Sequence, residues 1–211
     1  LFGCQPALLF NKVLSSTFWS EAFNMGYYAY YYMMGATILF YLFGRYNQAD
    51  KAGFVFLASF FLFYIIYEFL PVAGPQYYFK AVGVEAACTG DFPAVGYYFQ
   101  NHTEMLTPEI KGIFSKLVIG AQEVGERPTA AFPSSHVGMS TVTMMLAWKT
   151  RNRWLFWVMF PVYLLLCCAT VYILAHYLID SICGFFTAIL FFCFTSWLYD
   201  KLHPGYNTER D

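Results

Sequence analysis

Two short motifs hold the residues of this sequence that are best suited to chemistry. The segment AFPSSH ends at His136, the segment HYLID runs from His176 to Asp180, and each stands at the end of a long apolar stretch. Together they place two imidazoles, one carboxylate and a turn of small residues where a membrane would meet water. Imidazole and carboxylate groups serve as nucleophiles and general acids in enzymes. The combination indicates phosphoryl transfer on a lipid.

His176 and Asp180 are four residues apart, a spacing that places both on one face of a helix. A carboxylate beside an imidazole fixes its tautomer, turns the other ring nitrogen outward and raises its basicity. A histidine held in this way can attack phosphorus as a nucleophile. The alternative interpretation is a polar pair that caps a helix at the membrane interface.

The second motif predicts the start of a helix, because Pro133 and two serines stand directly before an apolar segment. The free backbone N–H groups and the hydroxyls of Ser134 and Ser135 would form an anion site at this helix end. His136 lies in the first turn, where it can donate a proton to a leaving oxygen as a general acid. The alternative is an ordinary capped membrane helix with a histidine at the interface.

Arg127 is the fixed positive charge nearest to this anion site, six residues before Pro133. A guanidinium group is suited to bidentate contact with phosphate oxygens. An exposed loop arginine paired with Glu123 or Glu126 is the competing interpretation. No CxxC motif occurs and the proposed nucleophile and acid are side chains, so we expect neither a metal nor a cofactor.

The composition is that of a membrane protein. Hydrophobic residues make up 59% of the 211 residues and charged residues only 12%, about half of the charged share in a soluble domain. The net charge of −1 and the lack of a basic patch exclude a nucleic-acid partner. The expected partners are therefore the lipid bilayer and a lipid phosphate within it, with a hydroxyl acceptor if the phosphoryl group is transferred.

Five apolar segments predict an all-α, polytopic membrane bundle with a single catalytic domain over residues 1–211. They cover residues 23–43, 52–70, 134–148, 154–175 and 178–199. The first opens with a run of tyrosines, Tyr27 to Tyr32, which is typical of an interfacial aromatic belt. Residues 71–132 form a long loop, within which residues 110–124 have helical periodicity and are expected at the interface.

Basic residues predict the orientation in the membrane. Arg45 and Lys51 follow the first segment, residues 149–153 carry three more basic side chains, and the C-terminal tail adds Lys201 and Arg210. With five spans these regions share one side, which positive-inside bias makes cytoplasmic. The long loop and both histidines then face the extracytoplasmic side of a plasma membrane, expected to be a bacterial inner membrane.

These motifs resemble the type 2 phosphatidic acid phosphatase superfamily, whose members carry Lys…Arg-Pro, Pro-Ser-Gly-His and Ser-Arg…His-x-x-x-Asp blocks. Residues 133–136 resemble the second block, with Ser135 at the commonest glycine position, while His176 and Asp180 match the end of the third. The resemblance implies a phosphohistidine at His176, oriented by Asp180, and a leaving group protonated by His136. It also implies six spans, so we expect a further span upstream of Leu1.

Three positions depart from the family pattern. Thr170 stands where the third block has arginine, Gly120 where the first block has lysine, and Gln76 where one divergent branch has the arginine of a Gly-Pro-Arg element. That branch contains the inositol phosphorylceramide synthases, which transfer a phospho-headgroup between lipids. We therefore expect a lipid phosphatase, with a headgroup transferase as the alternative. A channel or transporter is disfavoured, because the polar residues cluster at one membrane face.

Overall fold

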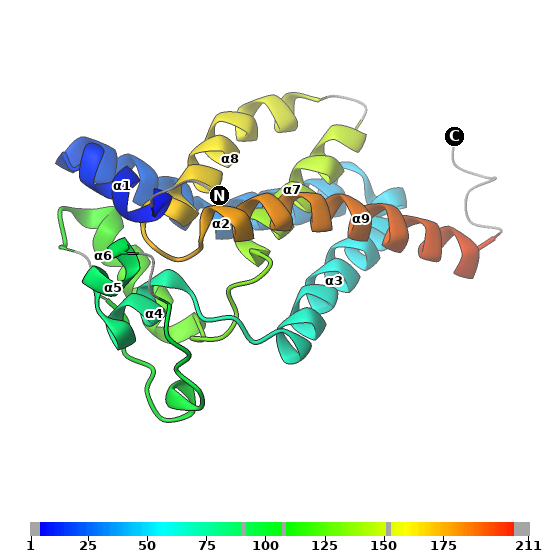
Figure 1. The fold of residues 1–211 in the computed structure, drawn as a ribbon. Coiled ribbons are helices and arrows are strands. Elements are labelled where there is room, and N and C mark those ends of the chain that lie inside the picture. Colours follow the sequence, from blue (N-terminus) through cyan, green and yellow to red (C-terminus); the bar gives the residue numbers. More distant parts are fainter. Residues whose placement is uncertain (1–4, 90–91, 107–108, 151–152, 205–211) are drawn as a thin grey trace.

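The fold is described from a computed structural model, for residues 5–89, 92–106, 109–150 and 153–204. These residues form nine α-helices, one 3₁₀-helix and no strand, apart from an isolated bridge between Val72 and Ala130 (Figure 1). The elements are α1 (Pro6–Val13), α2 (Thr17–Gly44), α3 (Tyr46–Phe69), α4 (Pro75–Val82), α5 (Val84–Thr89), η1 (Tyr98–Gln100), α6 (Ile113–Gly125), α7 (Ser135–Lys149), α8 (Trp154–Tyr172) and α9 (Leu178–Leu202). The prediction of an all-α membrane bundle is confirmed.

Each of the five predicted apolar segments forms a helix, but not every one could cross a membrane by itself. Within the described residues, three helices are long and apolar enough: Asn47–Phe69, Trp154–Tyr172 and Leu178–Leu202. Helix α2 has 28 residues but includes polar ones, such as Glu21 and Asn24. Helix α7 has only 15 residues, a rise of about 22 Å against a hydrocarbon core of about 30 Å.

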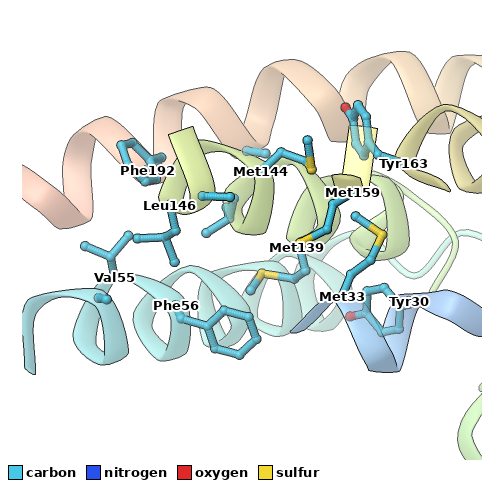
Figure 2. Close-up of a cluster of buried hydrophobic side chains, with 14 of the residues drawn as sticks. Tyr30, Met33, Val55, Phe56, Met139, Met144, Leu146, Met159, Tyr163 and Phe192 are labelled. Atoms are coloured by element: carbon cyan, nitrogen blue, oxygen red, sulfur yellow. The ribbon is translucent and has the colours of Figure 1, made fainter. Parts of the chain in front are cut away.

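Helix α7 is short because it is an interior helix. Ten of its 15 residues are buried, and it packs against α2, α3, α8 and α9. Its apolar side chains form the centre of the main core cluster, in which Met139 and Val142 are fully buried (Figure 2). A Cβ at Gly138 would collide with the ring of Phe63, so glycine here lets α3 approach the first turns of α7. The helix that carries His136 is thus fixed on several sides.

Two contacts show which helix ends lie together. Lys51 at the start of α3 forms an ion pair with Asp200 near the end of α9, with Nζ 2.6 Å and 2.8 Å from the carboxylate oxygens. The Tyr41 hydroxyl, near the end of α2, donates a hydrogen bond of 2.9 Å to the carbonyl of Leu146 near the end of α7. His176 precedes α9 and therefore lies at the opposite end of the bundle.

The basic residues that carried the orientation argument lie on the first of these ends, where α2, α7 and α9 finish and α3 and α8 begin. Arg45, Lys51, Lys149, Arg153 and Lys201 occupy these helix termini. Arg151 and Arg210, which entered the same argument, lie outside the described residues. Which end faces the cytoplasm stays a prediction.

The long loop 71–132 carries α4, α5, η1 and α6, and its helices gather at one end of the molecule (Figure 1). Helix α6 confirms the helical periodicity of residues 110–124 and packs along α2. The Glu21 carboxylate of α2 accepts hydrogen bonds of 2.9 Å from the N–H groups of Phe114 and Ser115, which fixes the start of α6. Glu126 and Arg127, which follow the end of α6, therefore lie in the same cavity as the histidines.

Candidate active site

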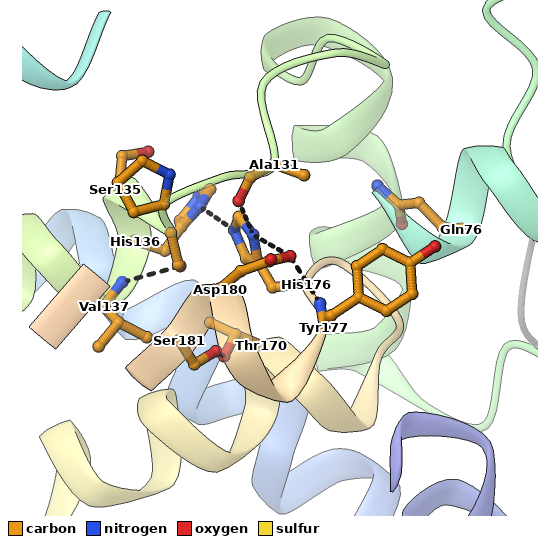
Figure 3. Close-up of polar contacts among 12 residues, drawn as sticks. Gln76, Ala131, Ser135, His136, Val137, Thr170, His176, Tyr177, Asp180 and Ser181 are labelled. Atoms are coloured by element: carbon orange, nitrogen blue, oxygen red, sulfur yellow. Dashed lines mark hydrogen bonds and ion pairs between the residues drawn. The ribbon is translucent and has the colours of Figure 1, made fainter. Parts of the chain in front are cut away.

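The structure brings the two predicted histidines together. His136 lies in the first turn of α7 and His176 in the turn between α8 and α9, and Nδ1 of His136 is 3.5 Å from Nε2 of His176 (Figure 3). Both rings line a cavity of about 330 Å³. Its walls also include Tyr67, Tyr77, Glu126, Arg127, Ser135 and Ala131. Residues from α3, α4, α6, α7 and the α8–α9 turn therefore converge on one polar site.

His176 is held by backbone carbonyl groups. Its Nδ1 lies 2.8 Å from the carbonyl oxygen of Ala131, and its backbone N–H donates a bond of 2.9 Å to the carbonyl of Thr170. A carbonyl oxygen only accepts, so the proton of the neutral ring is on Nδ1. The lone pair of Nε2 then points toward His136. His176 is 4% exposed, so the ring is almost closed off from solvent.

Asp180 has a different main contact from the one the sequence predicted. Its Oδ2 accepts a 2.8 Å hydrogen bond from the backbone N–H of Tyr177, while Nδ1 of His176 is 3.9 Å away. The carboxylate thus caps α9 and acts on the imidazole over a longer distance, and the short orienting bond comes from Ala131. The backbone carbonyl of Asp180 also accepts from the N–H of Ser134 at 2.9 Å, which joins the two motifs.

The two serines of the PSSH motif have separate environments. Ser134 is fully buried, its Oγ accepts the N–H of Val137 at 3.3 Å as the cap of α7, and it is not in the cavity wall. A Cβ at Gly184 of α9 would collide with the Ser134 carbonyl, so α9 lies directly against this turn. Ser135 does line the cavity, and its N–H donates a 2.9 Å bond to the Tyr67 hydroxyl. Of the two serines predicted to contact phosphate, only Ser135 therefore lines the cavity.

Arg127 lines the same cavity as both histidines, and its side chain is exposed at the cavity mouth. Among the ion pairs of the described residues, none joins Arg127 to Glu123 or Glu126. The competing interpretation of a paired loop arginine is thus not what the structure shows. The guanidinium group is placed to meet an incoming anion.

Four polar residues of the site were missed by the sequence analysis. Glu126 lies in the cavity wall and accepts hydrogen bonds from the Tyr27 hydroxyl, from Gln76 Nε2 at 2.5 Å and from Gln122 Nε2 at 3.4 Å. The Tyr27 oxygen is also 3.1 Å from Nε2 of His136. The tyrosine run was interpreted as an interfacial belt, but Tyr27 is only 2% exposed. Two signals were available: Glu126 stands beside Arg127, and Gln76 stands at the arginine position of the Gly-Pro-Arg element.

The positions that depart from the family pattern hold no replacement cation. Thr170 is fully buried, its hydroxyl contacts the Ser181 hydroxyl at 3.0 Å, and it is not in the cavity wall. Gly120 lies on an exposed part of α6. No group of three or more His, Cys, Asp or Glu side chains in the described residues is arranged to hold a metal ion.

The fold and the site define a class: helical membrane proteins with a histidine pair and an arginine in the wall of one polar cavity. The family model of the PAP2 superfamily matches residues 1–194. The chain therefore belongs to the PAP2 superfamily, which confirms the resemblance seen in its motifs. No curated protein and no solved structure gives a significant match. Membership supports a phosphatase-like function on lipid phosphates in general and an integral membrane location.

The environment of His176 predicts its titration. Burial, with His136 close by, lowers the pKa of His176 from its ordinary 6.5 to about 4. The ring is thus neutral in the folded protein above pH 4, and the stability that this provides is present above pH 6.5 and is lost as the pH falls toward 4. We expect the ¹⁵N signals of this imidazole, assigned by their loss in His176→Gln, to titrate near pH 4. A midpoint at or above 6.5 would contradict this environment.

Proposed function

We propose that this protein is a metal-independent lipid phosphatase, which hydrolyses a lipid phosphate or diphosphate through a phosphohistidine intermediate at the extracytoplasmic membrane face. The observation that carries the proposal is the pair of facing ring nitrogens, 3.5 Å apart, in a cavity that Arg127 also lines. One nitrogen serves as the nucleophile and the other as the proton donor. Residues 1–211 act as one catalytic domain in this proposal, with the loop 71–132 forming part of the site.

In the first step, the Nε2 lone pair of His176 attacks phosphorus. The bond from phosphorus to the leaving oxygen breaks with its electron pair on that oxygen, and protonated His136 gives it the proton on Nδ1. In the second step, neutral His136 takes a proton from water as the water oxygen attacks phosphorus. The P–N bond then breaks, its electrons return to His176, and phosphate is released. His136 ends each cycle protonated again.

Arg127 and Ser135 are the proposed contacts for the phosphoryl oxygens. A guanidinium group can offer two parallel N–H donors to phosphate, and its charge balances the charge that builds up on the transferring group. Asp180 supports the positive charge that forms on His176 when Nε2 bonds to phosphorus. Its distance of 3.9 Å from Nδ1 makes this an electrostatic effect that adds to the bond from Ala131.

A headgroup transferase is the second candidate, and Glu126 favours it. Its carboxylate lies in the cavity wall beside Arg127, so the fixed charges of these two neighbours cancel. A phosphomonoester dianion would meet repulsion from Glu126, whereas a phosphodiester monoanion would meet less. In this version an acceptor hydroxyl replaces water in the second step and gives a new phosphodiester.

The two candidates are separated by the products formed from two ³²P-labelled lipids, the phosphomonoester phosphatidic acid and a phosphodiester lipid. We expect the purified protein to release free ³²P-phosphate from labelled phosphatidic acid in detergent micelles, with or without an added polyol, and in the presence of a chelator. A labelled phosphodiester formed on the added polyol from the labelled phosphodiester lipid, without release of phosphate from phosphatidic acid, would favour the transferase. Loss of activity on chelation would contradict metal independence.

A further inference from the structure

Glu126 has no role in the two chemical steps above, although it lies in the cavity wall with both histidines. Its two oxygens accept from three donors: the Tyr27 hydroxyl on Oε1, and the side-chain amides of Gln76 and Gln122 on Oε2. A carboxylate that meets donors on both oxygens is best satisfied when it is ionised, because a protonated acid would bring a further hydrogen without an acceptor. Glu126 is thus a fixed negative charge held in place by α2, α4 and α6.

This charge determines the direction of the next hydrogen bond. An ionised carboxylate has no hydrogen to give, so the Tyr27 hydroxyl must be the donor to Glu126. The Tyr27 oxygen, 3.1 Å from Nε2 of His136, is then left as an acceptor. His136 must donate from Nε2, and the proton of its neutral form is therefore on that nitrogen.

The same reasoning fixes the space between the two histidines. Nδ1 of neutral His136 is bare, and Nε2 of His176 is bare because the Ala131 carbonyl holds the other proton. Two lone pairs therefore face each other across 3.5 Å. Adding one proton at Nδ1 of His136 removes this conflict and turns that ring into an imidazolium.

Burial disfavours a charged His136, and two features of its surroundings counteract this cost. The rings of Tyr27 and Tyr30 lie against it, with centroids 4.7 Å and 4.8 Å from that of the imidazole. Aromatic faces attract cations at this range. Only the Tyr27 hydroxyl lies between the negative charge of Glu126 and the imidazolium. Glu126 can therefore stabilise the imidazolium in the same sense as a carboxylate that contacts a catalytic histidine directly.

We infer that Glu126, acting through the Tyr27 hydroxyl, is the positioning residue of the general acid. It keeps one proton of His136 on Nε2 and stabilises the imidazolium whose Nδ1 proton goes to the leaving oxygen. The inference rests on the proposed function, and it applies to hydrolysis and to headgroup transfer alike. Tyr27 and Glu126 touch neither phosphorus nor the leaving oxygen in this account.

The test depends on how much each substrate needs a proton on its leaving group. Phosphatidic acid expels an alkoxide, which needs the acid, whereas para-nitrophenyl phosphate expels a stable phenolate, which does not. We expect Glu126→Gln and Tyr27→Phe to lower kcat on phosphatidic acid by about 10- to 100-fold, part of the full contribution of a general acid. We expect the first-turnover rate of nitrophenolate release from para-nitrophenyl phosphate, measured by stopped flow, to change by less than about threefold, because this first step does not need the acid.

Matched controls lie on the same two helices. Glu123→Gln removes an exposed carboxylate from α6, and Tyr31→Phe removes a hydroxyl from α2 at a residue that is 48% exposed. Both should behave as the unaltered protein on either ester. The double variant Tyr27→Phe/Glu126→Gln should lose no more than Glu126→Gln alone, because both groups act through one hydrogen-bonded chain.

The outcomes distinguish a failure of the role inferred for Glu126 from a failure of the proposed phosphatase function. Retained first-turnover release of nitrophenolate shows that a variant is folded and that His176 is intact. Equal losses on both esters, or no loss on either, would overturn the role of Glu126 and leave the phosphatase proposal standing. If the unaltered protein turned over neither ester, the proposed function and the inference would fall together.

Discussion

Replacement of His176 by alanine is expected to reduce turnover of phosphatidic acid to the background rate, a loss of at least about 10⁴-fold in kcat. The nucleophile is the one group that no neighbour can replace, since the neighbouring ring of His136 is held through its other nitrogen, Nε2, by the Tyr27 hydroxyl. The protein should also lose the ³²P label that the unaltered protein retains when a reaction is quenched in alkali, where a P–N bond survives. Rapid-quench labelling measures both effects.

His102→Ala is the matched control, because this histidine lies in the exposed loop and stacks on Tyr98. It should keep both turnover and label. Persistence of an alkali-stable label in His176→Ala would place the covalent bond on another residue. Unchanged turnover on every lipid phosphate tried would exclude the mechanism altogether.

The sequence was enough to locate the histidines, because each stands where an apolar segment begins. Such a position is fixed by local rules: Pro133 and two serines start α7, and Asp180 caps α9 from within its first turn. The helices that follow are apolar and long, so their starts share one end of the bundle. Local signals at chain positions 40 residues apart therefore predicted a common site.

The spacing of residues in the sequence could not predict which groups form hydrogen bonds with these histidines. The carbonyl that orients His176 belongs to Ala131, and every residue has such a carbonyl, so its side chain carries no signal. The prediction gave this role to Asp180, which the structure uses mainly for the N–H of Tyr177. Spacing on a helix shows which side chains can meet. It does not show whether a backbone group from another segment lies closer to the imidazole than the predicted side chain does.

Tyr27 was missed for a different reason. A run of tyrosines at the end of an apolar segment is typical of a membrane interface, and Tyr31 and Tyr32 are indeed exposed. Tyr27 faces inward instead, because α2 packs against α6 and α7 at this point. Which face of α2 is covered depends on helices more than 80 residues further along the chain. Tertiary packing therefore decides between an anchor and a site residue.

Hydropathy also did not show that one of the five apolar segments, residues 134–148, forms an interior helix. Residues 134–148 are apolar enough to suggest a crossing, but α7 is apolar because other helices surround it. Two threonine side chains of α7 are hydrogen-bonded within the helix: Thr141 and Thr143 donate to the carbonyls four residues before them. An interior helix and a lipid-facing helix have similar hydropathy, so composition alone does not distinguish them.

Replacement of His136 by alanine is also expected to lower kcat strongly. Which of the two chemical steps becomes slow depends on the leaving group of the ester. The loss of the proton donor should lower kcat on phosphatidic acid by about 10²- to 10⁴-fold. With para-nitrophenyl phosphate the first step should stay fast, since the phenolate leaves unprotonated and His176 keeps its orienting bond to Ala131. The second step should become slow, because the base that takes the proton from water is gone.

The phosphohistidine of the His136→Ala variant should therefore accumulate, and stopped-flow absorbance should show a burst of nitrophenolate equal to the enzyme concentration. The unaltered protein, in which His136 assists both steps, should give no burst of that size. A variant that is slow on both esters from the first turnover would mean that His136 acts before the P–O bond breaks, in binding or in folding. The facing nitrogens, at 3.5 Å, would then be a packing contact between two helix starts, and the proton would have to come from elsewhere in the cavity.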